Sequence, residues 1–154
     1  MPVSVPFTGG CACGAIRYEC SAAPLLVWKC HCRSCQRATG SAFNLNVIVP
    51  ATALTFTKGE PKYYVVTGGS GSKLYRGFCP ACGSPLGGKS DAFPDRRGVS
   101  AASMDDPSGL EPAADIWTAS AQPWDYLNPH LPKYERQPTA EEFQALLASR
   151  GYPF

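Results

Sequence analysis

Seven of the eight cysteines in this chain fall into three short groups, and these groups restrict its fold more than any other feature. Cys30, Cys32 and Cys35 lie within six residues, a spacing poorly suited to disulfide bonds among themselves. The other two groups are Cys11-Ala12-Cys13-Gly14 and Cys79-Pro80-Ala81-Cys82-Gly83, more than sixty residues apart. Thiols grouped in this way are typical of metal sites.

The two outlying pairs each look like one half of a tetrahedral zinc site. Glycine and small residues let backbone N–H groups turn toward the sulfurs, which offsets the charge of four thiolates. We therefore predict a structural Zn²⁺ that joins two distant segments and contributes folding free energy, with the ligands Cys11, Cys13, Cys79 and Cys82. The alternative is a thioredoxin-like redox pair at Cys79 and Cys82, but no helix is expected to begin there.

The three-cysteine group leaves a tetrahedral metal one ligand short, which is how catalytic zinc sites keep a position open. Three thiolates make zinc a weak Lewis acid, so Cys30, Cys32 and Cys35 favour exchange of a soft ligand such as a substrate thiol. His31 or a distant residue could instead close the site, and metal-free thiols are a further alternative. Strand alternation turns His31 away from its neighbours. Cys20 is predicted to be a buried core thiol.

Composition predicts a mainly β chain. The chain has 154 residues with 15 Gly and 15 Pro, which favours one domain (residues 1–154, core about 7–135) of many short elements joined by turns. Strand patterns occupy 16–20, 25–28, 43–49, 54–57, 63–66, 74–78, 99–103 and 116–118. The 43–49 strand is expected to be half-buried, 36–40 to be a turn or short helix, 68–72 a hairpin tip and 124–138 a loop.

One helix is predicted near the C-terminal end, over about 139–150. Thr139 can cap it, Glu142 stands at the capping-box spacing, and Gly151 suits the position after the helix. Its apolar face consists of Phe143, Leu146 and Leu147.

Charge and hydropathy exclude several classes of protein. The formal charge is +2, and seven thiolates with two Zn²⁺ would change it to about −1, so nucleic-acid binding is not expected. No segment is long and apolar enough to span a membrane, and residues 1–7 do not resemble a signal peptide, so we expect a cytoplasmic protein. The oligomeric state is left open, with a homodimer as one alternative.

Other polar and aromatic residues allow both functional and structural readings. Asp105 and Asp106 could be an acid–base pair, but Asp-Asp-Pro is also an ordinary turn signature. Trp117 and Trp124 fit a core or a pocket wall. The basic residues that flank the three-cysteine group could bind substrate carboxylates or lie solvated at the surface: Lys29, Arg33 and Arg37.

These motifs together resemble the glutathione-dependent formaldehyde-activating enzyme family, also called the centromere protein V-like family. The matching stretches are Gly9-Gly10-Cys11-Ala12-Cys13-Gly14-Ala15-Ile16-Arg17-Tyr18, Cys30-His31-Cys32-Arg33-Ser34-Cys35-Gln36, Thr39-Gly40-Ser41-Ala42-Phe43 and Phe78-Cys79-Pro80-Ala81-Cys82-Gly83-Ser84-Pro85-Leu86. The resemblance covers about residues 7–135. One departure is Asp115, where histidine is often found.

The resemblance implies an Mss4-like fold of antiparallel sheets pinned by zinc, with the two zinc sites named above. It implies a zinc-dependent carbon–sulfur lyase that joins a small thiol such as glutathione to an aldehyde such as formaldehyde. Donors near the open site could stabilise the developing oxyanion, namely Arg33, Ser34 and Gln36. The alternatives are a non-enzymatic thiol carrier or zinc-stabilised binding module and, less favoured, a nucleic-acid-binding zinc module.

Overall fold

The computed structural model describes residues 3–68 and 71–150, and within these ranges the chain is mainly β. The strands are β1 (Phe7–Gly10), β2 (Arg17–Cys20), β3 (Leu26–Cys30), β4 (Asn44–Pro50), β5 (Leu54–Lys58), β6 (Lys62–Thr67), β7 (Lys73–Phe78), β8 (Pro85–Ser90), β9 (Arg96–Ser100), β10 (Ala114–Ile116) and β11 (Lys133–Tyr134). The helices are α1 (Arg33–Thr39), α2 (Ala140–Ser149) and the 3₁₀ turns η1 (Ala51–Ala53), η2 (Ala101–Ser103) and η3 (Thr118–Ser120).

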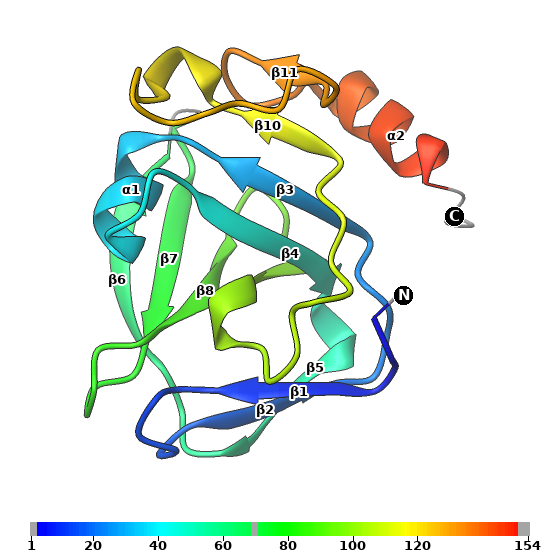
Figure 1. Ribbon diagram of the computed structural model, residues 1–154. Helices are drawn as coiled ribbons and strands as arrows, with labels where there is room; N and C mark the ends of the chain where they lie inside the picture. Colours follow the sequence, from blue (N-terminus) through cyan, green and yellow to red (C-terminus); the bar gives the residue numbers. More distant parts are fainter. Residues whose placement is uncertain (1–2, 69–70, 151–154) are drawn as a thin grey trace.

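The strands form two sheets. The smaller sheet has the order β1-β2-β5, and the larger has the order β11-β10-β3-β4-β9-β8-β7-β6. Most pairs are antiparallel, as predicted, but β10 runs parallel to both β3 and β11. Figure 1 shows β10 lying along β3, the strand that leads into the three-cysteine loop.

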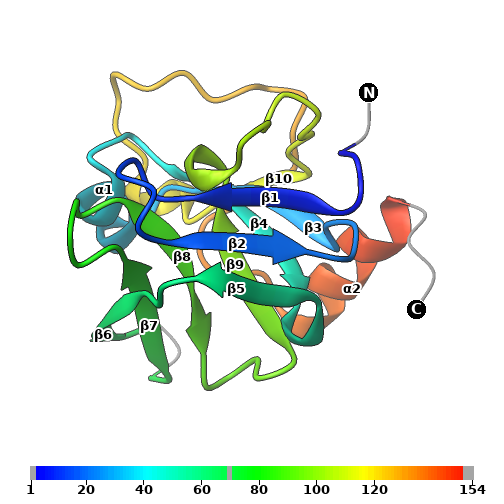
Figure 2. The ribbon, with the colours of Figure 1, turned by 90° about the horizontal axis from the view of Figure 1, so that it is seen from below.

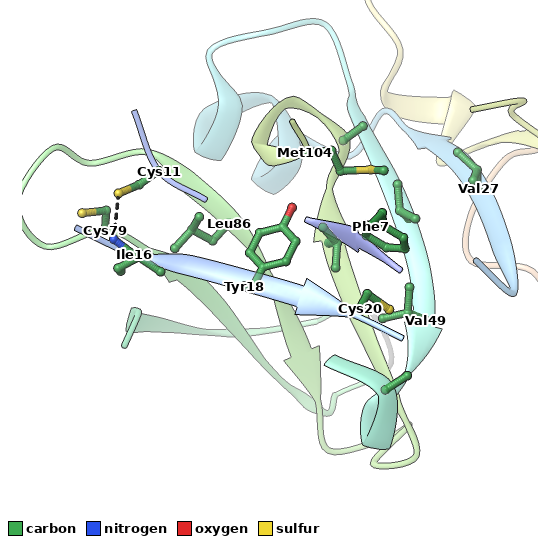
Figure 3. Packing of buried hydrophobic residues seen from close by; sticks show 14 residues of the cluster. Phe7, Cys11, Ile16, Tyr18, Cys20, Val27, Val49, Cys79, Leu86 and Met104 are labelled. Carbon is green, nitrogen blue, oxygen red and sulfur yellow. Dashed lines mark hydrogen bonds between the residues drawn. The ribbon is translucent and has the colours of Figure 1, made fainter. Parts of the chain in front are cut away.

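A first core lies between the small sheet and the larger one, which Figure 2 shows one behind the other. Tyr18 and Cys20 point inward from β2 and are both almost fully buried, so the predicted inward face of this strand and the buried state of Cys20 are confirmed. Val47 and Val49 contribute from β4. Figure 3 shows Tyr18 in this core, with Cys11 and Cys79 at one end and Cys20 and Val49 toward the other.

A second core covers the opposite face of β3 and β4. Ile48 belongs to this core, between Val47 and Val49 of the first core, because successive residues of a strand face opposite sides. The expectation of a half-buried 43–49 strand is therefore wrong at its centre, where both faces are covered. Helix α2 supplies the cover, and its buried residues are Phe143, Leu146 and Leu147, as predicted.

The start of α2 confirms the predicted capping box. Thr139 accepts a hydrogen bond from the Glu142 backbone N–H, and the Glu142 carboxylate accepts one from the Thr139 backbone N–H. Phe143 packs edge-on against Trp28, with ring centroids 5.6 Å apart. The predicted glycine after the helix, Gly151, lies outside the described residues.

Removal of this cap should have a measurable cost. Thr139→Ala is expected to lower the free energy of unfolding by about 1 kcal/mol, because one N–H at the helix start loses its acceptor. Urea denaturation followed by circular dichroism measures this change. Thr139→Ser keeps the hydroxyl and should unfold close to the wild type; an equal loss in both variants would contradict a role for the cap.

Several predicted boundaries are wrong for local reasons. The predicted 99–103 strand is β9, which begins at Arg96 and gives way to η2 after Ser100. The predicted 116–118 strand ends at Ile116, because Trp117 adopts a left-handed backbone with φ of 58°. The 124–138 region contains the two-residue strand β11. No helix in the described part of the chain has the length and apolar character needed to cross a bilayer.

Candidate metal centres

The four outlying cysteines come together in space. Cys11 and Cys13 lie in the turn between β1 and β2, and Cys79 and Cys82 lie in the turn between β7 and β8. Their sulfurs all lie within 4.8 Å of one another. The Cys11–Cys13 and Cys13–Cys79 sulfur separations are 3.6 and 3.8 Å. Sulfurs about 2.3 Å from a tetrahedral zinc would be about 3.8 Å apart, so the donor set fits zinc.

Backbone and hydroxyl donors surround this four-cysteine cluster. Ile16 donates its backbone N–H to Cys11 Sγ at 3.2 Å. Ser84 Oγ lies 3.1 Å from Cys82 Sγ and also accepts the Ala12 N–H at 3.0 Å, which joins the two turns. Hydrogen bonds from Ser84 lower the pKa of Cys82 to about 5. The pKa of Cys11 is lowered as well, so the donors around this cluster favour the thiolate form of Cys11 and Cys82, the form in which cysteine binds a metal.

The two cysteine turns share one backbone conformation. Gly14 and Gly83 both have positive φ, 77° and 78°, and each donates its N–H to the carbonyl of the first cysteine in its turn. This left-handed conformation is open to glycine without steric cost. The glycine after each cysteine pair is thus required by the geometry that folds the pair back on itself.

The three-cysteine cluster stands where β3 ends and α1 begins. Cys30 is the last residue of β3, Cys32 caps α1, and Cys35 lies in its first turn. Their sulfurs all lie within 4.8 Å of one another. Cys35 donates its backbone N–H to Cys32 Sγ at 3.3 Å. Hydrogen bonds from Cys30 and Cys35 hold the pKa of Cys32 well below its usual range.

Helix α1 begins earlier than the predicted 36–40 segment. Cys32 has extended backbone angles, and its sulfur accepts the hydrogen bond that a serine or aspartate oxygen accepts in an ordinary N-cap. Cysteine is not a usual capping residue, so the sequence pattern placed the helix start too late. The consequence is that Cys32 and Cys35 are set by a helical turn, with Cys30 delivered from the strand.

Arg76 is a site residue that sequence reasoning missed. It comes from β7, and its Nε donates to Ser34 Oγ at 2.9 Å while its Nη2 donates to Cys35 Sγ at 3.4 Å. At Cys35 the hydrogen bond with Cys30 lowers the pKa, but the hydrogen bond with Cys32 and burial leave the pKa above its usual value; the Arg76 charge lowers the pKa of both Cys32 and Cys35. A basic residue three places before Cys79 was the available signal, but nothing in the sequence pairs β7 with α1.

His31 lies outside the sulfur cluster, as strand alternation predicted. Its side chain is fully buried, and Nε2 lies 2.8 Å from Asp115 Oδ1 on β10. Asp125 Oδ2 faces the other ring nitrogen, Nδ1, at 3.5 Å. His31 also donates its backbone N–H to Ile116 O at 3.0 Å. Asp115 therefore anchors the loop between Cys30 and Cys32 to the parallel strand beside it.

The proposed substrate contacts divide between two sides of α1. Ser34 faces β7 through Arg76, whereas Gln36 is buried and donates to His31 O at 2.6 Å and to Ser120 O at 3.0 Å. Gln36 Oε1 accepts hydrogen bonds from Arg33 and, at 3.0 Å, from Gln122 Nε2. An open cavity of about 430 Å³ lies on this second side, lined by Arg33, Gln36, Arg37, Gly40, Ser41, Ala42 and Trp124.

The remaining candidates take structural positions. Asp105 accepts hydrogen bonds from Arg17 and Thr8, which lower its pKa to about 2, and it ties the small sheet to the turn after η2. Asp106 accepts from Ser108 within that turn. Lys29 lies over the Phe43 ring at 4.9 Å. Among the tryptophans, Trp117 packs against the second core, and Trp124 is 73% exposed.

A mainly β chain with two sheets, a C-terminal helix and these two cysteine clusters has the architecture of the zinc-pinned Mss4-like domains. Residues 6–120 match the family model described as "Glutathione-dependent formaldehyde-activating enzyme". The chain belongs to this family, and the resemblance seen in the cysteine motifs is confirmed.

A solved structure supports the fold. The chain is similar to a Rhodobacter sphaeroides protein whose crystal structure was determined as a structural genomics target. The two share 20% sequence identity and a TM-score of 0.51, over 82% of this chain and 98% of the other. At this identity the likeness concerns the fold alone.

Proposed function

We propose that this protein is a zinc-dependent carbon–sulfur lyase that acts on the adduct of a small thiol and an aldehyde. The observation that supports it most is the three-cysteine cluster, whose donor set leaves a tetrahedral ion one position short. The matched family description names glutathione and formaldehyde as the chemistry of such proteins. Cys30, Cys32 and Cys35 would hold this zinc, and Cys11, Cys13, Cys79 and Cys82 a structural one.

Zinc held by three thiolates would supply a position where a substrate sulfur is kept deprotonated at neutral pH. The residues around it then prepare the reaction. Backbone N–H of Cys35 and the Arg76 guanidinium stabilise negative charge on the cluster. The substrate sulfur attacks the aldehyde carbon, a C–S bond forms, and the carbonyl oxygen receives the proton that the thiol released. The reverse reaction breaks the C–S bond and returns that proton.

The cavity beside α1 gives the substrate a second point of attachment. Arg33 and Arg37 place two guanidinium groups there, and guanidinium groups bind carboxylates in bidentate geometry. We infer that Gln36 positions Arg33, because the Gln36 amide oxygen accepts a hydrogen bond from the Arg33 guanidinium. The cavity residues Arg33 and Gln36 directly follow Cys32 and Cys35 in the chain, which favours a thiol of tripeptide size, extending about 10 Å, as the substrate.

The activity is tested by mixing purified protein with glutathione and formaldehyde and following adduct formation and breakdown by NMR exchange. The wild type should exceed the spontaneous rate, and Cys32→Ser should return it to that rate. Cys20→Ser is the control, because Cys20 is a buried thiol outside both clusters. No acceleration by the wild type with several thiols and aldehydes would reject the enzyme proposal.

The alternative function is a thiol carrier or binding module that uses the same two clusters. Saturable binding of thiols without any acceleration would favour this alternative. Binding that needs Cys32 but not Cys20 would still place the thiol at the three-cysteine cluster.

A further inference from the structure

The two cysteine clusters differ in the kind of group that donates to their sulfurs. In the described residues, the four-cysteine cluster receives its hydrogen bonds from backbone N–H groups and from Ser84. The three-cysteine cluster receives one from a guanidinium, Arg76 Nη2 to Cys35 Sγ at 3.4 Å. In the described residues a guanidinium therefore donates to a sulfur of one cluster only; the arginine nearest the other cluster, Arg17, is paired with Asp105.

The position of this charge is fixed by the fold. Arg76 lies in the middle of β7, paired with Tyr64 of β6 and Gly88 of β8. Its Nε is held by Ser34 Oγ at 2.9 Å, which leaves Nη2 directed at the sulfur. The side chain is half-buried, so its field is screened less than that of an exposed arginine. The sequence suggested Ser34 as a substrate contact. In the structure, Ser34 also orients Arg76.

The charge balance explains why one cluster alone needs this group. Four thiolates around a divalent ion carry −2 in total, but their coordination is complete and no further anion enters. Three thiolates carry −1, and a fourth, exogenous thiolate would raise this to −2 within a partly buried site. One adjacent guanidinium returns the filled site to −1, and close charges of opposite sign interact strongly at such a site.

We propose that Arg76 makes the three-cysteine centre selective for an anionic fourth ligand, so that thiolates bind in preference to neutral donors. Arg76 acts on the incoming sulfur through charge and through its contact with Cys35. This inference rests on the proposed function, because it requires that the centre hold a divalent ion with one exchangeable position.

The test compares an anionic with a neutral ligand on the Co²⁺-substituted protein. Co²⁺ replaces zinc; a new sulfur ligand adds charge-transfer absorption, and binding of either ligand changes the visible d–d bands of the ion. Wild type, Arg76→Met and Arg76→Lys are titrated with 2-mercaptoethanol, which binds as a thiolate, and with imidazole, which binds as a neutral donor. We expect Arg76→Met to weaken thiol binding about tenfold or more while the imidazole affinity stays within about twofold. Arg76→Lys should recover part of the thiol affinity.

The outcomes separate this inference from the proposed function. Lys73→Met removes a positive charge from an exposed position on the same strand and should leave both affinities unchanged. Equal weakening of thiol and imidazole in Arg76→Met would show a structural effect and overturn charge selectivity, as would an unchanged thiol affinity. A wild type that binds imidazole but no thiol would overturn both this inference and the proposed thiol site. Wild-type protein that binds neither ligand would show that the metal centre has no exchangeable position, which would reject the proposed function and this inference with it.

Discussion

Cys79→Ser is expected to abolish the cooperatively folded state at 25 °C and, with it, the binding of zinc. Cys79 is fully buried at the end of the first core, where its sulfur lies 3.8 Å from Cys13 Sγ (Figure 3). Zinc at structural sites of this kind contributes about 10–16 kcal/mol of binding free energy, which is folding free energy when the unfolded chain holds no site. Domains are stable by only about 5–15 kcal/mol, so the loss should exceed the margin.

The reason for so large an effect lies in what the cluster joins. Its two halves belong to different sheets, since the β1–β2 turn is in the small sheet and the β7–β8 turn in the large one. Besides the metal ligands, the turns are joined by neutral contacts such as the hydrogen bond from the Ala12 N–H to Ser84 Oγ. Without the metal, the buried sulfurs of Cys11 and Cys79 would lose the ligand bonds that offset most of their loss of hydration.

Cys20→Ser is the matched control for Cys79→Ser. Cys20 is equally buried and belongs to the same core, but it lies outside both clusters and donates to Ala22 O at 3.4 Å, which a serine hydroxyl can also do. Elemental analysis should find two zinc ions per chain in Cys20→Ser, with near-UV circular dichroism like that of the wild type. If Cys79→Ser lost one zinc but unfolded at the same urea concentration as Cys20→Ser, the structural assignment would be wrong.

The sequence predicted most of what depends on local pattern. The cysteine spacing anticipated two clusters, the alternation in β2 anticipated its buried face, and the Thr139 and Glu142 pair anticipated the cap of α2. Each of these features depends on residues close in sequence or on the strict chemistry of metal ligands. The same holds for His31, whose turn away from the cluster follows from its place between Cys30 and Cys32.

What the sequence did not predict depends on contacts between distant segments. The 43–49 strand was predicted to be half-buried because its sequence gives no sign that α2 covers the face to which Ile48 belongs. Arg76 became a site residue through the approach of β7 to α1. Asp115 was only a departure from the family pattern until the parallel pairing of β10 with β3 placed it against His31. In each case the tertiary neighbour, and not the local propensity, determines the role.

Asp115→Ala should lower the free energy of unfolding by about 1–3 kcal/mol, the range found when a buried hydrogen-bonding group loses its partner. Asp115 and His31 are both fully buried, and the Nε2–Oδ1 distance of 2.8 Å is that of a strong hydrogen bond. The alanine variant leaves His31 Nε2 without this acceptor in a site closed to water. Urea denaturation of the zinc-loaded protein measures the loss.

Two further variants separate the loss of this contact from general damage. Asp115→Asn keeps an acceptor oxygen for His31 and should cost less than alanine. Asp91→Ala removes an exposed carboxylate that accepts a hydrogen bond from the Tyr75 hydroxyl at 3.3 Å. This change should alter the free energy of unfolding by less than about 0.5 kcal/mol. Because His31 stands between Cys30 and Cys32, Asp115→Ala should also release the three-cysteine metal to a chelator faster than Asp91→Ala. Equal stability and equal release in the two alanine variants would show that β10 does not anchor the metal loop through Asp115.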